Sequence, residues 1–188
     1  MEATITASLD PTIVERARSG DLVAFESIVR HRMDAVYRLT FAIVGNEADA
    51  ADATQDAFVA AWRQIGSLRD AERVEAWLAR IAVNAARMLA RGRRRRSVRE
   101  IPGLTPETND VPSPIGDPAG HLADDARALG AALEHLSSDQ RAILALHHLD
   151  GRSIGEIAAI LRIPDGTVKS RLFAARRALV ERLERAGK

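Results

Sequence analysis

A segment rich in proline and glycine, residues 97–120, divides the chain and limits what it can fold into. The segment holds five of the seven prolines and three of the glycines. Proline fixes the backbone and removes a hydrogen-bond donor, so this composition opposes both helix and sheet. We therefore predict two small domains, residues 10–96 and 121–188, joined by a flexible linker. At about 3.3 Å per residue, the linker reaches about 80 Å when extended.

Composition indicates that both domains are helical. Aromatic residues make up only 4% of the 188 residues, whereas hydrophobic residues make up 46%. The cores must then be built from Ala, Leu, Ile and Val, which favours helices over sheets. Helical periodicity extends from Asp10 to Arg96 and resumes near His121. It is broken at residues 19–20, 45–46 and 66–67. The predicted fold is all-α.

The small net charge of +1 hides a strong division of charge along the chain. The net charge is −3 over residues 1–90, +6 over 91–99, −7 over 100–161 and +5 over 162–188. Two basic blocks separated by an acidic block predict two contacts with a polyanion, held apart by a segment that avoids it.

The second domain contains two capping signals followed by a short turn. Ser137 precedes Gln140 by three residues, and Ser153 precedes Glu156 by the same spacing, which is typical of capping boxes. The turn at residues 163–166 leads into a longer basic helix. Two helices joined in this way predict a helix-turn-helix, whose second helix enters the major groove of DNA.

The basic helix has an apolar arc of about 80° and a basic face opposite it. The arc contains Val168, Leu172, Ala175, Leu179 and Leu183. Phe173 lies on the far side with Lys169, Ser170 and Arg177. Lysine and arginine can reach guanine edges, and an aromatic ring can contact a thymine methyl group. The alternative interpretation is a solvated basic face, which leaves the exposed aromatic residue unexplained.

In the first domain, the helix over residues 72–96 also has two faces. Its apolar arc contains Val74, Trp77, Leu78, Ile81, Ala85, Met88 and Leu89. Arg80, Asn84, Arg87 and Arg91 fall within about 60° of one another on a different side and continue into Arg93–Arg96. Such a row suits a phosphate backbone with one base-reading amide. Trp77, at its border, is either a stacking platform for an unpaired base or a core residue, and Arg93–Arg96 alternatively form a basic tail.

The preceding helix carries an acidic stripe. Asp49, Asp52 and Asp56 recur at i, i+3 and i+7 with Gln55 beside them, and Phe58, Trp62 and Ile65 lie on the opposite side as core. Because nucleic acid would repel this surface, we expect its partner to be a basic protein surface. A solvated acidic face is the alternative.

Several classes of function lack their sequence signals. The chain has no cysteine, no HExxH pattern, no glycine-rich phosphate loop and no GxSxG elbow, so we expect no catalytic residue, no metal site and no cofactor, and the chain is not predicted to be an enzyme. No apolar run approaches the roughly 18 residues of a membrane span, and the N-terminus lacks the features of a signal peptide. We expect a cytoplasmic protein that does not insert into membranes.

These motifs resemble the extracytoplasmic-function group of bacterial RNA polymerase sigma factors. "DAADATQDAFVAAW" and "WLARIAVNAAR" are similar to sigma region 2, and residues 136–179, from "LSSDQRAIL" to "GTVKSRLFAARRAL", are similar to region 4. The similarity extends over about residues 25–96 and 133–183. It implies a region 2 bundle over residues 10–96 and a region 4 helix-turn-helix over residues 121–188.

The resemblance also implies partners and contacts. The partners are core RNA polymerase, through the clamp helices of its largest subunit and its flap, promoter DNA, and an anti-sigma factor. The clamp helices would be bound by Asp49, Asp52, Gln55, Asp56 and Phe58. The minus-10 element would be contacted by Trp77, Arg80 and Asn84, with Arg87 and Arg91 on the same face. The minus-35 bases would be read by Lys169, Ser170, Arg171 and Phe173, with Arg152, Arg176 and Arg177 on phosphates.

Two other functions compete with this interpretation. A dimeric helix-turn-helix repressor or activator explains the second domain but gives the acidic stripe no role. A nucleic-acid-processing enzyme would need a metal or nucleophile constellation that the sequence does not offer.

Overall fold

The computed structural model describes residues 9–99 and 121–186, and the regular elements in this part of the chain are all helices. Its helices are α1 (Pro11–Arg18), α2 (Leu22–Val44), α3 (Glu47–Gln64), α4 (Val74–Arg99), α5 (His121–Glu134), α6 (Ser138–His148), α7 (Ile154–Leu161) and α8 (Asp165–Ala186), with short 3-10 turns η1 (Ile65–Ser67) and η2 (Ala71–Arg73). The expected all-α class is confirmed. Helix α4 continues to Arg99, three residues into the segment predicted as linker, and residues 100–120 lie outside the described part.

Helices α1 to α4 form the first bundle, with α2, α3 and α4 packed against one another. Helix α2 begins at the cap Asp21, whose side chain accepts from the Ala24 N–H. It ends at Gly45, whose φ of 86° lies in the left-handed region that glycine adopts without strain. Between α2 and α3 the buried hydroxyls of Thr40 and Thr54 are 2.8 Å apart and satisfy each other.

Helices α5 to α8 form the second bundle, and both capping boxes predicted from sequence are present. Ser137 accepts from the Gln140 N–H and Ser153 accepts from the Glu156 N–H, and the side chains at the third position return bonds to the cap N–H groups. These caps fix where α6 and α7 begin. The buried core of this bundle contains Ile143, Leu146, Ile157 and Val168.

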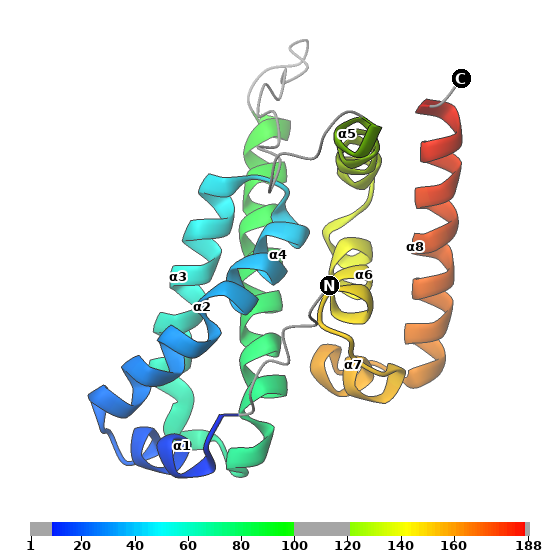
Figure 1. The fold of residues 1–188 in the computed structure, drawn as a ribbon. Helices are drawn as coiled ribbons and strands as arrows, with labels where there is room; N and C mark the ends of the chain where they lie inside the picture. The colour runs from blue at the N-terminus through cyan, green and yellow to red at the C-terminus, as the bar shows by residue number, and fades with distance from the viewer. Residues whose placement is uncertain (1–8, 100–120, 187–188) are drawn as a thin grey trace.

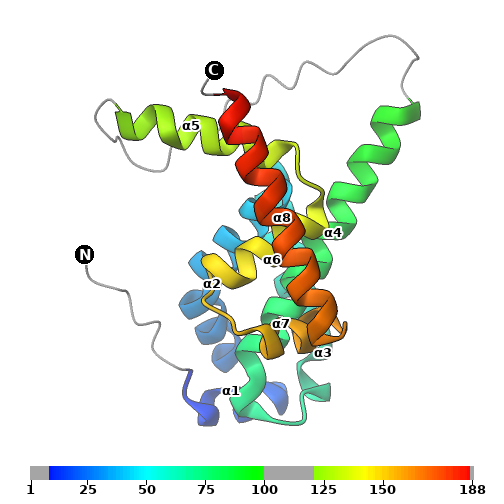
Figure 2. The same ribbon diagram turned by 90° about the vertical axis from the view of Figure 1, so that its right-hand side faces the viewer.

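The two bundles lie against each other rather than apart (Figure 1). Helix α6 packs on α2, and α6 and α7 both contact α4. The buried residues of both bundles form one continuous hydrophobic cluster. Figure 2 shows α8 crossing in front of α6 and α7, on the side away from the first bundle. This arrangement was not predicted from the sequence.

Two residues assigned to the core from periodicity are more exposed than expected. Met88 is 68% exposed and Trp62 is 37% exposed. Met88 lies on the part of α4 that borders an open groove, where none of the helices in the described part of the chain covers it. Trp62 packs its ring on Phe25, with ring centroids 5.0 Å apart, and leaves the other side to solvent. The prediction that these two residues are core was wrong.

Candidate polymerase and nucleic-acid interfaces

The acidic stripe is an exposed feature of α3. Asp52, Gln55 and Asp56 are exposed, while the side chain of Asp49 is only 18% exposed. Asp49 lies in the first turn, where the cap Asn46 accepts from its N–H at 2.9 Å. Its Oδ2 accepts from Asn46 Nδ2 at 3.0 Å and from Arg93 Nη1 at 2.9 Å. Three members of the stripe are therefore open to a partner, and the fourth is already paired.

Phe58 differs from the rest of the set to which it was assigned. It is 7% exposed and belongs to the hydrophobic core between α3 and its neighbours. A buried ring cannot contact a partner directly, so any part it has in partner binding is to hold α3 in place from beneath.

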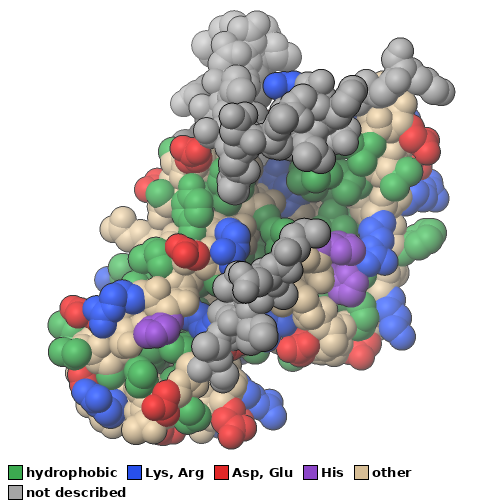
Figure 3. Space-filling model, viewed as in Figure 1, with side chains coloured by type: hydrophobic (Ala, Val, Ile, Leu, Met, Phe, Trp, Pro, Cys, Tyr) green, Lys and Arg blue, Asp and Glu red, His purple; other side chains and the backbone are tan. Residues whose placement is uncertain are grey.

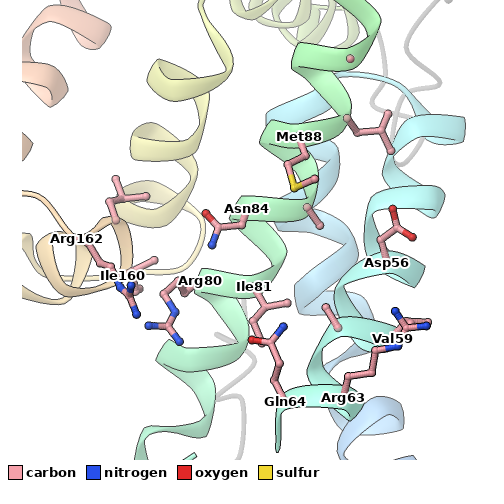
Figure 4. Close-up of a pocket in the computed structure, with 15 residues that line it drawn as sticks. Asp56, Val59, Arg63, Gln64, Arg80, Ile81, Asn84, Met88, Ile160 and Arg162 are labelled. Carbon is pink, nitrogen blue, oxygen red and sulfur yellow. The ribbon is translucent and has the colours of Figure 1, made fainter. Parts of the chain in front are cut away.

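The arginine row of α4 lies beside a groove of about 800 Å³ between α3, α4 and α7. Arg80 and Asn84 point from α4 toward Ile160 of α7 and Arg162, the C-cap of α7, with Asp56 on the opposite wall (Figure 4). The floor includes Ile81, Ala85 and Leu89. The groove thus has an apolar base with amide, cationic and acidic groups at its edges. Periodicity grouped Arg80 with Asn84 on one side of α4, but it assigned Met88, which also lines this groove, to the core and gave no sign that α7 would form one wall.

The remaining predicted residues of α4 occupy different surroundings. Trp77 is half-buried and packs against the core, Asn84 and Arg91 are exposed, and Arg80 is half-buried. Arg87 is 17% exposed because its guanidinium pairs with Asp139 of α6. The structure therefore gathers this row on one face, but it engages one arginine with the other bundle.

Helix α8 presents its predicted reading face to solvent. Lys169, Ser170, Arg171 and Phe173 are all exposed, and Phe173 is 68% exposed, whereas Val168, Leu172 and Ala175 are buried on the other side. Figure 3 shows basic side chains along the outer edge of α8 with a hydrophobic side chain among them. The Ser170 hydroxyl donates to the Thr167 carbonyl at 3.1 Å, so its remaining lone pairs face outward.

Two arginines of α8 are held by neighbouring side chains. Arg176 donates to Nε2 of His148 from Nε at 3.3 Å and from Nη2 at 3.2 Å, and Arg177 Nε donates to Glu181 at 3.0 Å. Desolvation lowers the pKa of His148, and the positive charge of Arg176 and the neighbouring His147 lower it further. A neutral His148 can accept from Arg176, so the guanidinium is oriented along the helix surface.

Arg152 is engaged with carboxylates and is only 16% exposed. It donates to Asp150 at 2.8 Å and to Glu156 at 3.2 Å, and Glu75 of α4 lies 3.9 Å away. Burial alone would lower the pKa of Arg152, but its hydrogen bonds and charge interactions with Asp150 and Glu156 raise it overall. Contact between Arg152 and a phosphate would require it to leave these partners, a constraint that sequence spacing did not indicate.

Sequence reasoning also missed the ion pair between Arg32 and Glu75. Arg32 of α2 is 6% exposed and pairs with Glu75 of α4, which in turn faces Arg152 of the second bundle. No local pattern marks these residues, because their partners are more than forty residues away in sequence.

Comparison with known proteins decides the family. Residues 28–96 match the family model for Sigma-70 region 2, and residues 126–179 match that for Sigma-70, region 4. The chain is 36% identical to the ECF RNA polymerase sigma-E factor of Escherichia coli K12, over 93% of this chain and 94% of that protein. This chain belongs to the extracytoplasmic-function sigma factors. It is also 32% identical to the RNA polymerase sigma-H factor of Pseudomonas aeruginosa, over 96% of each chain.

Solved structures support the same assignment for this sigma factor. The structure of CnrH in complex with the cytosolic domain of CnrY superposes with a TM-score of 0.64 at 29% identity, covering 93% of this chain and 97% of CnrH. The sigma factor RpoE of Bartonella quintana, in complex with the anti-sigma factor NepR, gives 0.65 at 28% identity, covering 85% and 96%. The fold with region 2 and region 4 domains and the class of function, promoter-specific transcription initiation, both agree with the sequence analysis. Among the described residues, no helix is both long and apolar enough to span a bilayer.

Proposed function

We propose that this sigma factor acts through three separate surfaces: the α3 stripe on core RNA polymerase, the α4 face on the minus-10 element and the α8 face on the minus-35 element. The proposal also keeps the bounds predicted from sequence, residues 10–96 for region 2 and 121–188 for region 4. The observation that carries it is the simultaneous exposure of Asp52, Asp56 and Phe173 on helices whose opposite sides are buried.

The α8 face suits a duplex. An α-helix fits the major groove of B-DNA, and exposed Lys169, Arg171 and Phe173 offer two cations for guanine edges and a ring for a thymine methyl group. Arg176 and Arg177 lie farther along the same helix, where they can reach phosphates on either side of the groove. Arg152 joins them only if it leaves Asp150 and Glu156.

The α4 face suits an opened strand. Asn84 offers an amide that can both donate to and accept from a base edge, and the apolar floor beside it offers a surface for an unstacked base. Arg80, Arg87 and Arg91 supply cations for the backbone of the same strand. Half-buried Trp77 borders this face, where part of its ring remains available for stacking. Stacking lost when the duplex opens is thereby partly recovered on the protein.

The α3 stripe suits a basic protein surface. Asp52, Gln55 and Asp56 are exposed on successive turns, and Phe58 holds the helix from beneath. The clamp helices of the largest polymerase subunit and the polymerase flap are the proposed contacts. RNA synthesis then belongs to the polymerase, so the sigma factor itself needs no catalytic residue and no cofactor.

We further propose that the sigma factor works in the cytoplasm and is held inactive by an anti-sigma factor. The complex of Bartonella quintana RpoE with NepR supports the second part, because its sigma factor aligns with most of this chain. The chain carries no cysteine, so thiol-based sensing would belong to that partner.

Gel filtration with core RNA polymerase tests the assignment of α3. The unmodified chain should co-elute with core polymerase, and Asp52→Arg should abolish co-elution because it places a cation against a basic surface. Asp34→Arg on α2 makes the same charge change at another exposed site and should still co-elute. Equal co-elution of all three proteins would remove α3 from the polymerase interface.

If the chain elutes as a homodimer and does not bind the polymerase, the result supports the helix-turn-helix repressor instead. The same column run separates the two functions, because the elution volume of the chain alone reports its oligomeric state.

A further inference from the structure

In the free chain, Arg87 of α4 is already paired with a carboxylate. Arg87 Nε donates to Oδ1 of Asp139, and Arg87 Nη2 forms an ion pair with the same oxygen; Asp139 lies in the first turn of α6. The capping box of Ser137 and Gln140 fixes that turn, so Asp139 is presented to α4 by a well-defined helix start. The Arg87 side chain is 17% exposed and that of Asp139 is 48% exposed. The pair therefore lies at the edge of the contact between the two bundles, where solvent reaches the carboxylate.

Arg93 of the same helix is paired with a second carboxylate. Its Nη1 donates to Oδ2 of Asp49 at 2.9 Å, and the carboxylate is kept in place by Asn46 Nδ2 at 3.0 Å. Asp49 belongs to the α3 stripe proposed to bind polymerase. In the initiation complex, the basic face of α4 would bind DNA and the acidic stripe of α3 would bind the polymerase. In the free chain, Arg93 of α4 and Asp49 of the stripe instead form an ion pair with each other.

Guanidinium binds carboxylate and phosphate in the same way, through N–H groups directed at anionic oxygens. Arg87 cannot give the same N–H groups to Asp139 and to a DNA phosphate at once. We propose that Asp139 and Asp49 are internal phosphate substitutes, which occupy Arg87 and Arg93 in the free chain and compete with promoter DNA for them. This inference rests on the proposed role of α4 as the minus-10 face.

The position of Asp49 couples the two binding events. A basic polymerase surface that takes Asp49 releases Arg93 to DNA, and a phosphate that takes Arg93 releases Asp49 to the polymerase. Each partner therefore improves the binding of the other by the same factor. Polymerase binding and DNA binding become cooperative through one ion pair, without any change in the fold.

The first experiment measures the affinity of the free chain for a fluorescently labelled single-stranded DNA of twenty nucleotides by anisotropy. Asp139→Asn keeps the shape of the side chain and removes its charge, so the DNA should bind on the order of threefold to tenfold more tightly. The slope of log K against log salt should steepen by about 0.7, as expected for one added phosphate contact. Glu184→Gln removes the same charge from an exposed site on α8 and should change the affinity less than about twofold.

The double variant with Arg87→Gln makes this test specific. In that background Asp139→Asn should give no gain, because the arginine that it frees is absent. An unchanged affinity of Asp139→Asn, or a gain that persists without Arg87, would overturn the inference for this pair.

The second experiment measures binding to core RNA polymerase. Arg93→Gln should increase the affinity by about twofold to fivefold because it frees Asp49. Arg69→Gln removes the same charge from an exposed arginine between η1 and η2, outside the three proposed binding surfaces, and should leave the affinity unchanged. Equal affinities for Arg93→Gln and Arg69→Gln would overturn the coupling, whereas a chain that never binds polymerase would overturn the proposed function instead.

Discussion

Phe173 is the residue whose surroundings argue most directly for sequence-specific contact with DNA. It is 68% exposed on a helix whose other side is buried, and its neighbours on that face are Lys169 and Ser170. Because most of the Phe173 surface is exposed, its apolar ring is available to a base.

Phe173→Ala should therefore weaken recognition of the minus-35 element without destabilising the protein. We expect a loss of about 1–3 kcal/mol in binding free energy at a promoter that carries the cognate element. Binding of the holoenzyme to promoters with and without the element, measured by gel shift, checks this loss. Val180→Ala, at a site 52% exposed two turns later, is the control. An equal loss on both promoters would show that Phe173 reads no base.

His148 offers a second prediction at the residue scale. Its pKa is lowered, first by desolvation and then by the charges of Arg176 and His147, so the imidazole should titrate below its ordinary value of 6.5. Arg176→Ala should raise the pKa, because one cation is removed. NMR titration of the His148 ring measures both values. A pKa that stays the same after Arg176→Ala would show that the hydrogen bonds between these side chains do not persist in solution.

The titration of His148 has a defined sign for stability. Because folding lowers its pKa, the neutral ring favours the folded state, and this contribution is present above about 6.5 and is lost as the pH falls through the folded value.

At the scale of single helices, local sequence determines where α6 and α7 begin. Ser153 Oγ accepts from the Glu156 N–H at 3.3 Å, and Glu156 Oε2 accepts from the Ser153 N–H at 2.9 Å. These bonds satisfy two donors that would otherwise be unpaired at the helix end. Helix α7 is only eight residues long, so the cap is a large part of what makes it helical.

Ser153→Ala should lower the free energy of unfolding by about 1 kcal/mol. Urea denaturation followed by circular dichroism measures the change. Ser67→Ala removes a hydroxyl that donates to the carbonyl of Gln64, at a site that caps no helix start, and should change stability by less than about 0.5 kcal/mol. Equal effects at the two sites would mean that the capping box adds nothing beyond an ordinary surface hydroxyl.

The sequence predicted that the helices form, where they begin and which side of each is buried. Each of these features depends on residues only a few positions apart. Ser137 and Ser153 marked helix starts, and the period of 3.6 placed Val168 and Phe173 on opposite sides of α8. The same period failed for Met88 and Trp62, because whether a helix face is covered depends on a neighbouring helix. Arg87 was placed on the correct helix, but its pairing with Asp139 across the bundle contact was not foreseen, nor were the carboxylates that engage Arg152.

At the scale of the whole molecule, the sequence indicated two domains but not how they pack. The contact of α6 with α2 and of α7 with α4 buries apolar residues of both bundles in one cluster. Its polar edge uses Arg87 with Asp139 and Arg152 near Glu75. Such a contact has no sequence period, because it joins residues separated by the long segment that divides the chain. Arg87 and Arg152 are therefore already paired with carboxylates when the two bundles are packed together.

Transcription reconstituted from purified components tests whether this chain directs RNA polymerase to promoters. Core RNA polymerase is incubated with the chain and fragmented bacterial genomic DNA, and the 5′ ends of the RNA are sequenced. We expect RNA starts that depend on the chain and share two sequence blocks at fixed distances upstream, and we expect none with the Asp52→Arg variant. If no start depends on the chain, and the chain binds duplex DNA as a homodimer without polymerase, it does not act as a sigma factor.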